Sequence, residues 1–170
     1  MGKGLVLLYT GEGKGKTTAA FGAVLRALGH NQKVAIVQFF KGKAQETKVF
    51  KKINKKIKIW NYGKKFLCQN STKTNCELVR RAWSRCLKVL NDPSYFLLVI
   101  DEIHIALHYR FLETSEVIKA LKKRPPRQHV LLTGRGAPPV LMRFADIVTV
   151  MKCVKHPFER GLSAQPGIEF

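Results

Sequence analysis

The stretch "YTGEGKGKTTAAFG" (residues 9–22) almost matches the nucleotide-binding P-loop pattern G-x-x-x-x-G-K-[ST]. Thr10 stands where that pattern has its first glycine, and an additional lysine, Lys14, lies inside the loop. An apolar run precedes the stretch and a helical period follows it, so a flexible glycine turn is the weaker interpretation. The stretch therefore predicts a strand, a phosphate-binding loop and a helix.

The loop carries the residue types that binding a polyphosphate requires. Glycines let backbone N–H groups turn inward, and the following helix adds its positive end. Lys16 places a positive charge on the phosphates, Thr17 offers its hydroxyl to magnesium, and Lys14 supplies a second cation. The glycines that permit the inward turn are Gly11, Gly13 and Gly15.

Outward from the loop, short apolar runs alternate with segments of helical periodicity. This alternation favours a mostly parallel sheet of about five or six strands with helices on both faces. We therefore predict one α/β domain over residues 1–170, with an irregular tail over about 152–170. The predicted strands are 5–10, 33–40, 57–61, 95–102, 129–136 with its turn, and 146–151, and the predicted helices are 16–29, a short one at 49–53, 75–90 and 114–123.

Two acids, Asp101 and Glu102, follow an apolar strand. Ligands of parallel sheets sit at the carboxyl ends of the strands, so we expect the acids near the loop and near "TGRG" after Leu132. In P-loop proteins such acids hold magnesium, whereas a surface turn is the alternative. "DEIH" also resembles the D-E-x-H box of helicases, but those enzymes need two such domains. His104 and His108 are either a metal pair without an evident third ligand or ordinary packing and surface histidines.

The net charge of +20 is concentrated in residues 41–73, which hold eleven lysines and one acid. Such a run is typical of a solvated face. The alternatives are a surface for nucleic acid or a field that attracts ATP. With "DEIH", this run supports an alternative function, a single-domain P-loop ATPase that binds nucleic acid through residues 41–73. The aromatic residues of the run either stack on bases or belong to the core: Phe50, Trp60, Tyr62 and Phe66.

Composition excludes several classes of protein. With 45% hydrophobic residues among 170, the chain can build a core, which disordered proteins cannot. No apolar run approaches the ~20 residues of a membrane helix, and the first run is too short for a signal peptide. We therefore expect no membrane association and a cytoplasmic protein with reduced thiols. The cysteines lack the C-x-x-C spacing of zinc sites: Cys68, Cys76, Cys86 and Cys153.

Five segments occur in the same order in one known family: "TGEGKGKTTAAFG", "VAIVQFFKG", "VIDEI", "LTGRGAP" and the tail "VKHPFERGLSAQPGIEF". Through them the chain resembles the P-loop-type ATP:corrinoid adenosyltransferases of cobalamin synthesis and salvage, from about residue 5 to the C-terminus. That family also carries Thr at the position of Thr10, and other NTPases do not share the tail. The resemblance implies a RecA-like domain in which a corrinoid's cobalt(I) attacks the 5′ carbon of ATP and the whole triphosphate leaves.

The resemblance also implies which residues act. Cobalt is the nucleophile, so the protein supplies no acid, base or nucleophile, and Lys16 acts as an electrostatic stabiliser. Magnesium lies near Thr17 and Glu102 or Asp101. ATP is held in the reverse sense to ordinary P-loop proteins, which leaves its 5′ carbon open to the corrinoid. The implied ATP-binding residues are Gly11, Glu12, Gly13, Lys14, Gly15, Lys16, Thr17 and Thr18, with Lys41 and Arg135 as further candidates whose alternative role is structural.

The corrinoid side departs from the family pattern. Relatives carry a G-x-G-F-T-W-like segment whose aromatics cover the lower face of the corrin. Here the matching stretch is "GKKFLC" (residues 63–68), in which Cys68 replaces the tryptophan. Phe66 either covers the corrin or belongs to the core, and Cys68 either fills space or approaches cobalt as a soft ligand. A relative that binds both substrates without turnover is therefore a third hypothesis. The resemblance further implies a homodimer and an electron-donating flavoprotein or reductase.

Overall fold

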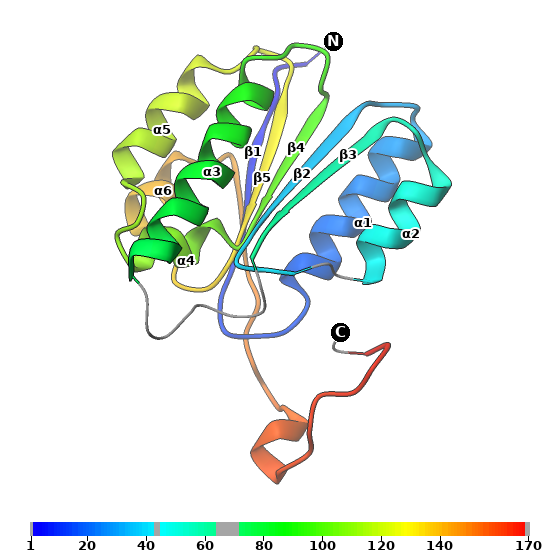
Figure 1. Cartoon of the computed structure of the whole chain (residues 1–170), viewed down its shortest axis with the longest axis vertical. Coiled ribbons are helices and arrows are strands. Elements are labelled where there is room, and N and C mark those ends of the chain that lie inside the picture. Colours follow the sequence, from blue (N-terminus) through cyan, green and yellow to red (C-terminus); the bar gives the residue numbers. More distant parts are fainter. Residues whose placement is uncertain (1, 43–44, 64–71, 169–170) are drawn as a thin grey trace.

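A computed structural model of the chain describes residues 2–42, 45–63 and 72–168 (Figure 1). These residues form a six-stranded sheet in the order β3-β2-β4-β5-β1-β6, with every neighbouring pair parallel. The predicted α/β fold with a mostly parallel sheet is therefore confirmed. The strands are β1 (Val6–Thr10), β2 (Val34–Phe39), β3 (Ile57–Tyr62), β4 (Leu97–Asp101), β5 (His129–Thr133) and β6 (Ile147–Val150).

Helices cover both faces of this sheet (Figure 1). One face carries α1 (Lys16–Gly29) and α2 (Gln45–Ile53). The other face carries α3 (Thr72–Leu90), α4 (Ile103–His108), α5 (Thr114–Lys123) and α6 (Pro139–Phe144). After β6 the chain continues into a tail that includes one 3-10 helix, η1 (Pro157–Arg160), and extends beyond the carboxyl edge of the sheet (Figure 1).

Side chains alternate along the inner strands between two apolar cores. In β2, Val34 and Ile36 belong to the core under α1 and α2, whereas Ala35 and Val37 belong to the core under α3 to α6. Strand β4 alternates in the same way. Because these strands are buried on both faces, they read in the sequence as continuous apolar runs.

Four elements differ most from the predictions. Helix α2 begins at Gln45 rather than at the predicted residue 49. Strand β4 spans Leu97–Asp101 rather than 95–102, because Glu102 leaves the strand with a left-handed φ of 63°. Helix α3 begins at Thr72, three residues before the predicted start at 75. Helix α6 was not predicted, because its 6 residues are too few to show a period; Pro139 suits its first turn, where no N–H partner is needed.

The fold brings several polar segments to the carboxyl edge of the sheet. Strand β5 lies between β1 and β4, so one strand separates the phosphate loop from the acid pair. Two non-glycine residues at this edge, Phe40 after β2 and Glu102 after β4, have left-handed φ values of 54° and 63°. Such conformations cost on the order of 1–3 kcal/mol and cluster at functional sites. The carboxyl edge is therefore the place to look for the active site.

Candidate active site

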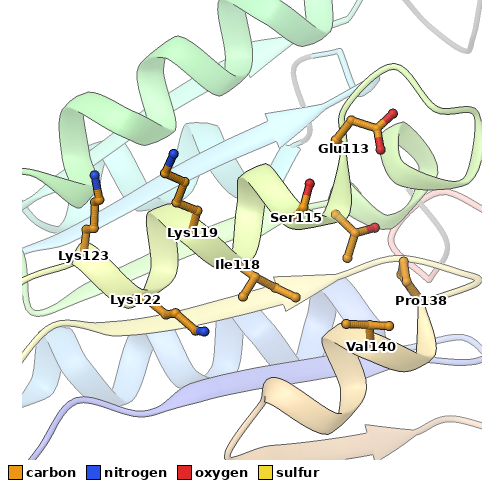
Figure 2. Close-up of a pocket in the computed structure, with 9 residues that line it drawn as sticks. Glu113, Ser115, Ile118, Lys119, Lys122, Lys123, Pro138 and Val140 are labelled. Carbon is orange, nitrogen blue, oxygen red and sulfur yellow. The ribbon is translucent and has the colours of Figure 1, made fainter.

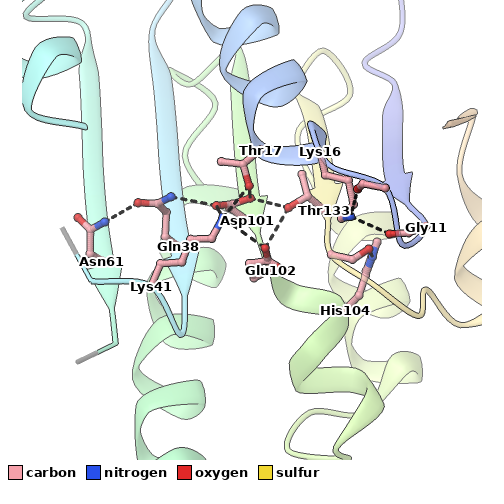
Figure 3. A network of polar contacts seen from close by, with 12 residues as sticks. Gly11, Lys16, Thr17, Gln38, Lys41, Asn61, Asp101, Glu102, His104 and Thr133 are labelled. Atoms are coloured by element: carbon pink, nitrogen blue, oxygen red, sulfur yellow. Dashed lines mark hydrogen bonds and ion pairs between the residues drawn. The ribbon is translucent and has the colours of Figure 1, made fainter. Parts of the chain in front are cut away.

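The phosphate loop (residues 11–15) joins β1 to α1 in a conformation that depends on glycine. Gly11 and Gly15 have φ values of 99° and 108°, a region that side-chain-bearing residues rarely adopt. Lys16 folds back over the loop, and its Nζ donates to the carbonyls of Gly11 at 2.7 Å and Gly13 at 2.6 Å (Figure 3). Because the N-cap of α1 is Gly15, which has no capping side chain, the first N–H groups of the helix can bind an anion.

The loop glycines also permit a close contact with the tail. Met151 and Lys152, directly after β6, run past the loop, and the Gly13 N–H donates to the Met151 carbonyl at 2.7 Å. A Cβ on Gly11 would lie 2.4 Å from the Met151 carbonyl oxygen, and a Cβ on Gly13 would lie 2.6 Å from that of Lys152. The glycines are therefore needed for packing against the tail as well as for turning N–H groups inward.

Thr10, which replaces the first P-loop glycine, is buried at the end of β1. Its hydroxyl accepts a hydrogen bond from the Ala137 N–H at 3.3 Å, and its carbonyl accepts one from the Met151 N–H at 2.8 Å. A glycine would lose the first of these contacts. Thr10 therefore ties the loop to the turn between β5 and α6.

The substitution Gly13→Ala tests the contact between loop and tail. The new Cβ would meet backbone oxygens of Lys152 and Met151 at 2.6 and 2.8 Å, and backbone cannot move aside as a flexible side chain can. We expect the free energy of unfolding to fall by about 1–3 kcal/mol, as in other overpacked sites, and ATP binding to weaken. Thermal unfolding and ATP titration measure the two effects.

The matched control is Gly22→Ala, on the exposed side of α1. A Cβ at Gly22 meets nothing within 4 Å, so alanine should stabilise the helix by about 0.5–1 kcal/mol. If the two substitutions change the unfolding temperature alike, the packing argument is wrong.

Asp101 lies at the centre of a buried polar network (Figure 3). Its Oδ1 accepts hydrogen bonds from the hydroxyls of Thr17 at 2.9 Å and Thr133 at 2.6 Å. Its Oδ2 accepts from the Gln38 amide at 2.9 Å and from the Lys41 ammonium at 3.0 Å. The network joins β4 to β2, to β5 and to the first turn of α1, so the acid pair is not a surface turn.

Lys41 follows β2, on the opposite side of the acid pair from β1 and the phosphate loop, and its side chain contacts the first turn of α1. Its Nζ is 2.6 Å from Thr17 Oγ1, 3.0 Å from Asp101 Oδ2 and 3.3 Å from Glu102 Oε1. Burial disfavours the charge on Lys41, but the two carboxylates outweigh burial and raise its pKa above the ordinary value of 10.5. Lys41 therefore stays charged, and it contacts the three residues predicted to hold magnesium.

Three residues that support this network were not selected from the sequence: Gln38, Asn61 and Thr133. Asn61 donates to the Gln38 side-chain oxygen, and the Thr133 hydroxyl accepts from the Glu102 N–H at 3.0 Å. Gln38 and Thr133 are fully buried within apolar strands. Since a buried polar group requires a partner, a polar residue inside an apolar run is the signal that would have found them.

The outer rim of the loop is exposed. Arg135 Nη1 pairs with Glu12 Oε2 at 3.1 Å, and both side chains are about two-thirds exposed, at 65% and 67%. Lys14 and Thr18 are also exposed, whereas Lys16 is buried. Burial, followed by repulsion from Arg135, lowers the pKa of Lys16 below its ordinary value. Among the charged residues predicted for the loop, Lys16 is therefore buried, whereas Glu12 and Lys14 form an accessible rim.

His104 is buried beside the loop at the start of α4. Its Nδ1 lies 2.9 Å from the Gly134 carbonyl, which can only accept, so Nδ1 carries the proton. Among the described residues its Nε2 has no hydrogen-bond partner. Burial lowers the pKa of His104 to about 4, which the bond to Gly134 opposes and repulsion from Lys16 reinforces. His104 is therefore neutral at physiological pH.

This histidine should make stability fall in mild acid. The unfolded chain binds a proton near pH 6.5, but the folded chain does not until about pH 4. The free energy of unfolding should therefore decrease as the pH falls through that window, by about 3 kcal/mol in all. Urea unfolding in buffer without divalent cations measures the profile, and His104→Leu should flatten it. A wild-type profile that His104→Leu leaves unchanged would contradict this prediction.

Magnesium fits the three residues predicted to hold it. Thr17, Asp101 and Glu102 present one hydroxyl and two carboxylates, which are the hard oxygen ligands that Mg²⁺ prefers. The Lys41 ammonium among them shows that the place stabilises a cation. By contrast, no group of three or more His, Cys, Asp or Glu side chains suited to a metal occurs in the described part of the chain. The predicted alternative of a metal pair at His104 and His108 has no support. His104 is buried whereas His108 is exposed, so the two side chains do not face a common site.

The basic segment is largely a solvated face where the structure describes it. Lys48 and Lys52 on α2 and Lys58 on β3 are exposed. Phe50 belongs to the core, where its ring packs edge-on against Phe21 at 5.3 Å. Trp60 and Tyr62 are partly buried against the other core, and Arg85 lies over the Trp60 ring. Phe66 and Cys68, the candidates for corrinoid contacts, lie outside the described residues.

A groove of about 630 Å³ lies elsewhere, along α5 and beside the start of α6 (Figure 2). Lys119, Lys122 and Lys123 line it together with the apolar side chains of Ile118 and Val140. None of its lining residues belongs to the phosphate loop or the acid pair.

In the described part of the chain, none of the helices has both the length and the apolar composition to cross a membrane.

Sequence comparisons show which known proteins this chain is similar to. The family described as ATP:corrinoid adenosyltransferase BtuR/CobO/CobP matches residues 2–170. A corrinoid adenosyltransferase of Pseudomonas aeruginosa is 40% identical to this chain, in a match that covers 99% of this chain and 84% of the relative's length. One of Escherichia coli K12 is 36% identical over 99% of this chain and 86% of its own. The match thus includes both the phosphate loop and the tail.

A solved structure supports the fold. A KaiC-like protein of the archaeon Pyrococcus horikoshii superposes with a TM-score of 0.53, covering 88% of this chain and 73% of its own. Its sequence is only 21% identical, so the likeness concerns the fold alone. It confirms the predicted RecA-like P-loop architecture.

Proposed function

The chain belongs to the family of ATP:corrinoid adenosyltransferases, and on that premise we propose how its residues perform the transfer. Enzymes of this family adenosylate corrinoids with ATP. We propose that the cobalt(I) centre of a corrinoid attacks the 5′ carbon of ATP, as in cobalamin synthesis or salvage. The carbon–oxygen bond to the triphosphate breaks, both of its electrons leave with the triphosphate, and a cobalt–carbon bond forms. The family match over residues 2–170 is the observation that carries this proposal.

The protein's task in this reaction is to hold the leaving group. In our proposal the triphosphate lies on residues 11–18, where the N–H groups of the loop and of the start of α1 surround it. Lys16, fixed by two loop carbonyls, neutralises charge that develops as the triphosphate leaves. Arg135, Glu12 and Lys14 stand at the accessible rim, and Lys41 stands beside Thr17. None of these residues needs to act as an acid, a base or a nucleophile, because cobalt is the nucleophile.

Thr17, Asp101 and Glu102 would hold magnesium. When bound, Mg²⁺ would neutralise part of the triphosphate's negative charge. The structural support is the set of hydroxyl and carboxylate oxygens at the end of β4 and the start of α1, already arranged around a cation. Thr133 and Gln38 orient the Asp101 carboxylate through hydrogen bonds to its two oxygens.

The corrinoid contacts, the partners and the location remain proposals. Phe66 and Cys68 would lie against the corrin, and a flavoprotein or reductase would supply the electron that cobalt(I) requires. A homodimer is supported by exposed apolar side chains on the edge strand β6, among them Val148 and Val150. Free thiols at Cys76, Cys86 and Cys153 suit the cytoplasm. A single-domain organisation over residues 1–170 also stays a prediction.

An anaerobic reaction with ATP and chemically reduced cobalamin tests the proposed function. We expect the absorbance change of cobalt–carbon bond formation, with one triphosphate released per product. Formation of ADP and phosphate alone, without a cobalt–carbon product, would overturn the proposal. Stimulation of that hydrolysis by RNA or DNA would instead favour the nucleic-acid alternative, which the family match does not favour.

A further inference from the structure

The position of Lys41 carries a further inference. Its ammonium contacts all three oxygen-bearing side chains of the proposed magnesium cradle, namely Thr17, Asp101 and Glu102, at 2.6, 3.0 and 3.3 Å (Figure 3). We use "cradle" for these three residues. An ammonium with three donors in such a place satisfies oxygens that would otherwise be buried without a counter-charge.

The ammonium and a divalent cation cannot share the cradle. Mg²⁺ draws its oxygen ligands to about 2.0–2.1 Å and requires near-octahedral geometry. A lysine nitrogen that bonds the same oxygens would lie within a few ångströms of the metal, with like charge and its donors aimed at ligand lone pairs. One occupant must therefore leave when the other binds.

The backbone aims Lys41 at the cradle. Phe40 before it has a left-handed φ of 54°, and its N–H donates to the Tyr62 carbonyl at 2.8 Å. Gly63 permits this turn, because a Cβ there would lie 2.4 Å from the Phe40 carbonyl carbon and 2.7 Å from the Lys41 nitrogen. Asn61 donates to the Gly42 carbonyl at 3.2 Å. Residues on both sides of Lys41 are thus held, while its four-carbon stem can still swing.

We expect the triphosphate seat to be the alternative place for the ammonium. Thr17, which Lys41 contacts at 2.6 Å, directly follows Lys16 and the glycine loop. A short movement of the side chain would therefore exchange carboxylate oxygens for phosphate oxygens.

We propose that the Lys41 ammonium occupies the magnesium cradle as a counter-ion until magnesium and triphosphate bind together. The ammonium then leaves the cradle to the metal and pairs with the triphosphate instead. The proposal rests on the proposed magnesium site and on triphosphate binding by the loop. It makes the two ligands interdependent: the metal alone must displace Lys41, whereas with triphosphate present Lys41 has an anion to move to. By linkage, triphosphate strengthens metal binding and metal strengthens triphosphate binding.

Metal titration of the protein without corrinoid tests this exchange. Mn²⁺ serves as the metal probe, followed by electron paramagnetic resonance, and inorganic triphosphate serves as the anion. In Lys41→Met, Mn²⁺ alone should bind about tenfold or more tighter than in wild type, and triphosphate with Mg²⁺ about tenfold weaker, the size expected of one charged contact. Triphosphate should therefore raise the affinity for Mn²⁺ by a smaller factor in Lys41→Met than in wild type.

Two variants serve as controls. Lys14→Met removes the same charge from the exposed rim of the loop and should leave the affinity for Mn²⁺ alone close to wild type. Lys41→Arg keeps a cation at the cradle, so Mn²⁺ alone should bind as weakly as in wild type. Thermal unfolding with and without Mg²⁺ shows whether Lys41→Met is folded, and added Mg²⁺ should restore any stability that it loses.

Unchanged or weaker Mn²⁺ binding by a folded Lys41→Met, relative to wild type and Lys14→Met, would overturn the exchange. Glu102→Gln distinguishes that failure from a wrong metal site. Glu102→Gln should weaken Mn²⁺ binding in both the wild-type and the Lys41→Met background. If it does not, the metal binds elsewhere, and the proposed exchange at Lys41 is wrong as well. Neither result depends on adenosyl transfer, so failure of the transfer reaction itself would be seen separately.

Discussion

Replacing Lys16 by alanine will lower kcat/KM for adenosyl transfer by about a thousandfold. The Lys16 ammonium is held by the carbonyls of Gly11 and Gly13 at 2.7 and 2.6 Å, beside the proposed seat of the triphosphate. Negative charge grows there as the triphosphate leaves, and losing one preorganised donor of this kind costs about 10²–10³ in rate. Because Lys16 is buried, solvent replaces its charge poorly. Cobalt–carbon bond formation under anaerobic reduction, measured over a range of ATP concentrations, gives the effect.

Lys14→Ala is the matched control, since it removes the same charge from the same loop at an exposed position. We expect it to lower kcat/KM about fivefold or less, as exposed charges contribute little. Thermal unfolding of both variants separates loss of charge from loss of loop structure, because Lys16 also supports the loop. A folded Lys16→Ala that retains the activity of Lys14→Ala would contradict the role assigned to Lys16.

Asp101→Asn will have the largest effect on stability. Asp101 is fully buried, and its two oxygens accept hydrogen bonds from hydroxyl, amide and ammonium donors. An asparagine presents an NH₂ group to some of these donors and removes the counter-charge of Lys41. Breaking a buried pair in this way costs about 3–5 kcal/mol. Urea unfolding in metal-free buffer measures the loss, and adenosyl transfer should fall with it.

Glu102→Gln provides the comparison, because it changes the neighbouring acid in the same way. The Glu102 side chain is 17% exposed and contacts Lys41 at 3.3 Å. Its loss should cost only about 1 kcal/mol, close to the value of a surface ion pair. If the two substitutions destabilise the protein equally, Asp101 does not organise the network.

Local patterns were enough to predict most of the fold and part of the site. The phosphate loop was predictable because its glycines, Lys16 and Thr17 act through backbone conformation and adjacent residues. The acid pair was predictable because Asp101 ends an apolar run. Helix α6 was missed because six residues show no periodicity, and the supporting Gln38 was missed because its partner is 63 residues away in the sequence.

The basic run shows where composition leaves a question open. Eleven lysines between residues 41 and 73 look alike in the sequence. In the fold, Lys48, Lys52 and Lys58 face solvent, whereas Lys41 turns inward after the left-handed Phe40 and contacts two carboxylates. Only the different environments of these lysines distinguish a solvated charge from a charge in the site.

The sequence by itself determined the parallel α/β fold, the phosphate loop, the acid pair and, through the resemblance of its motifs, the family. These features are encoded by residues close together along the chain or by the periodicity of apolar side chains. Only the tertiary structure decided that the tail packs against Gly11 and Gly13, that Thr10 ties the loop to the next turn, and that Lys41 lies among the proposed magnesium ligands. The reason is physical: these contacts join segments from different strands, and they exist only where the parallel sheet brings the carboxyl ends of those strands to one edge.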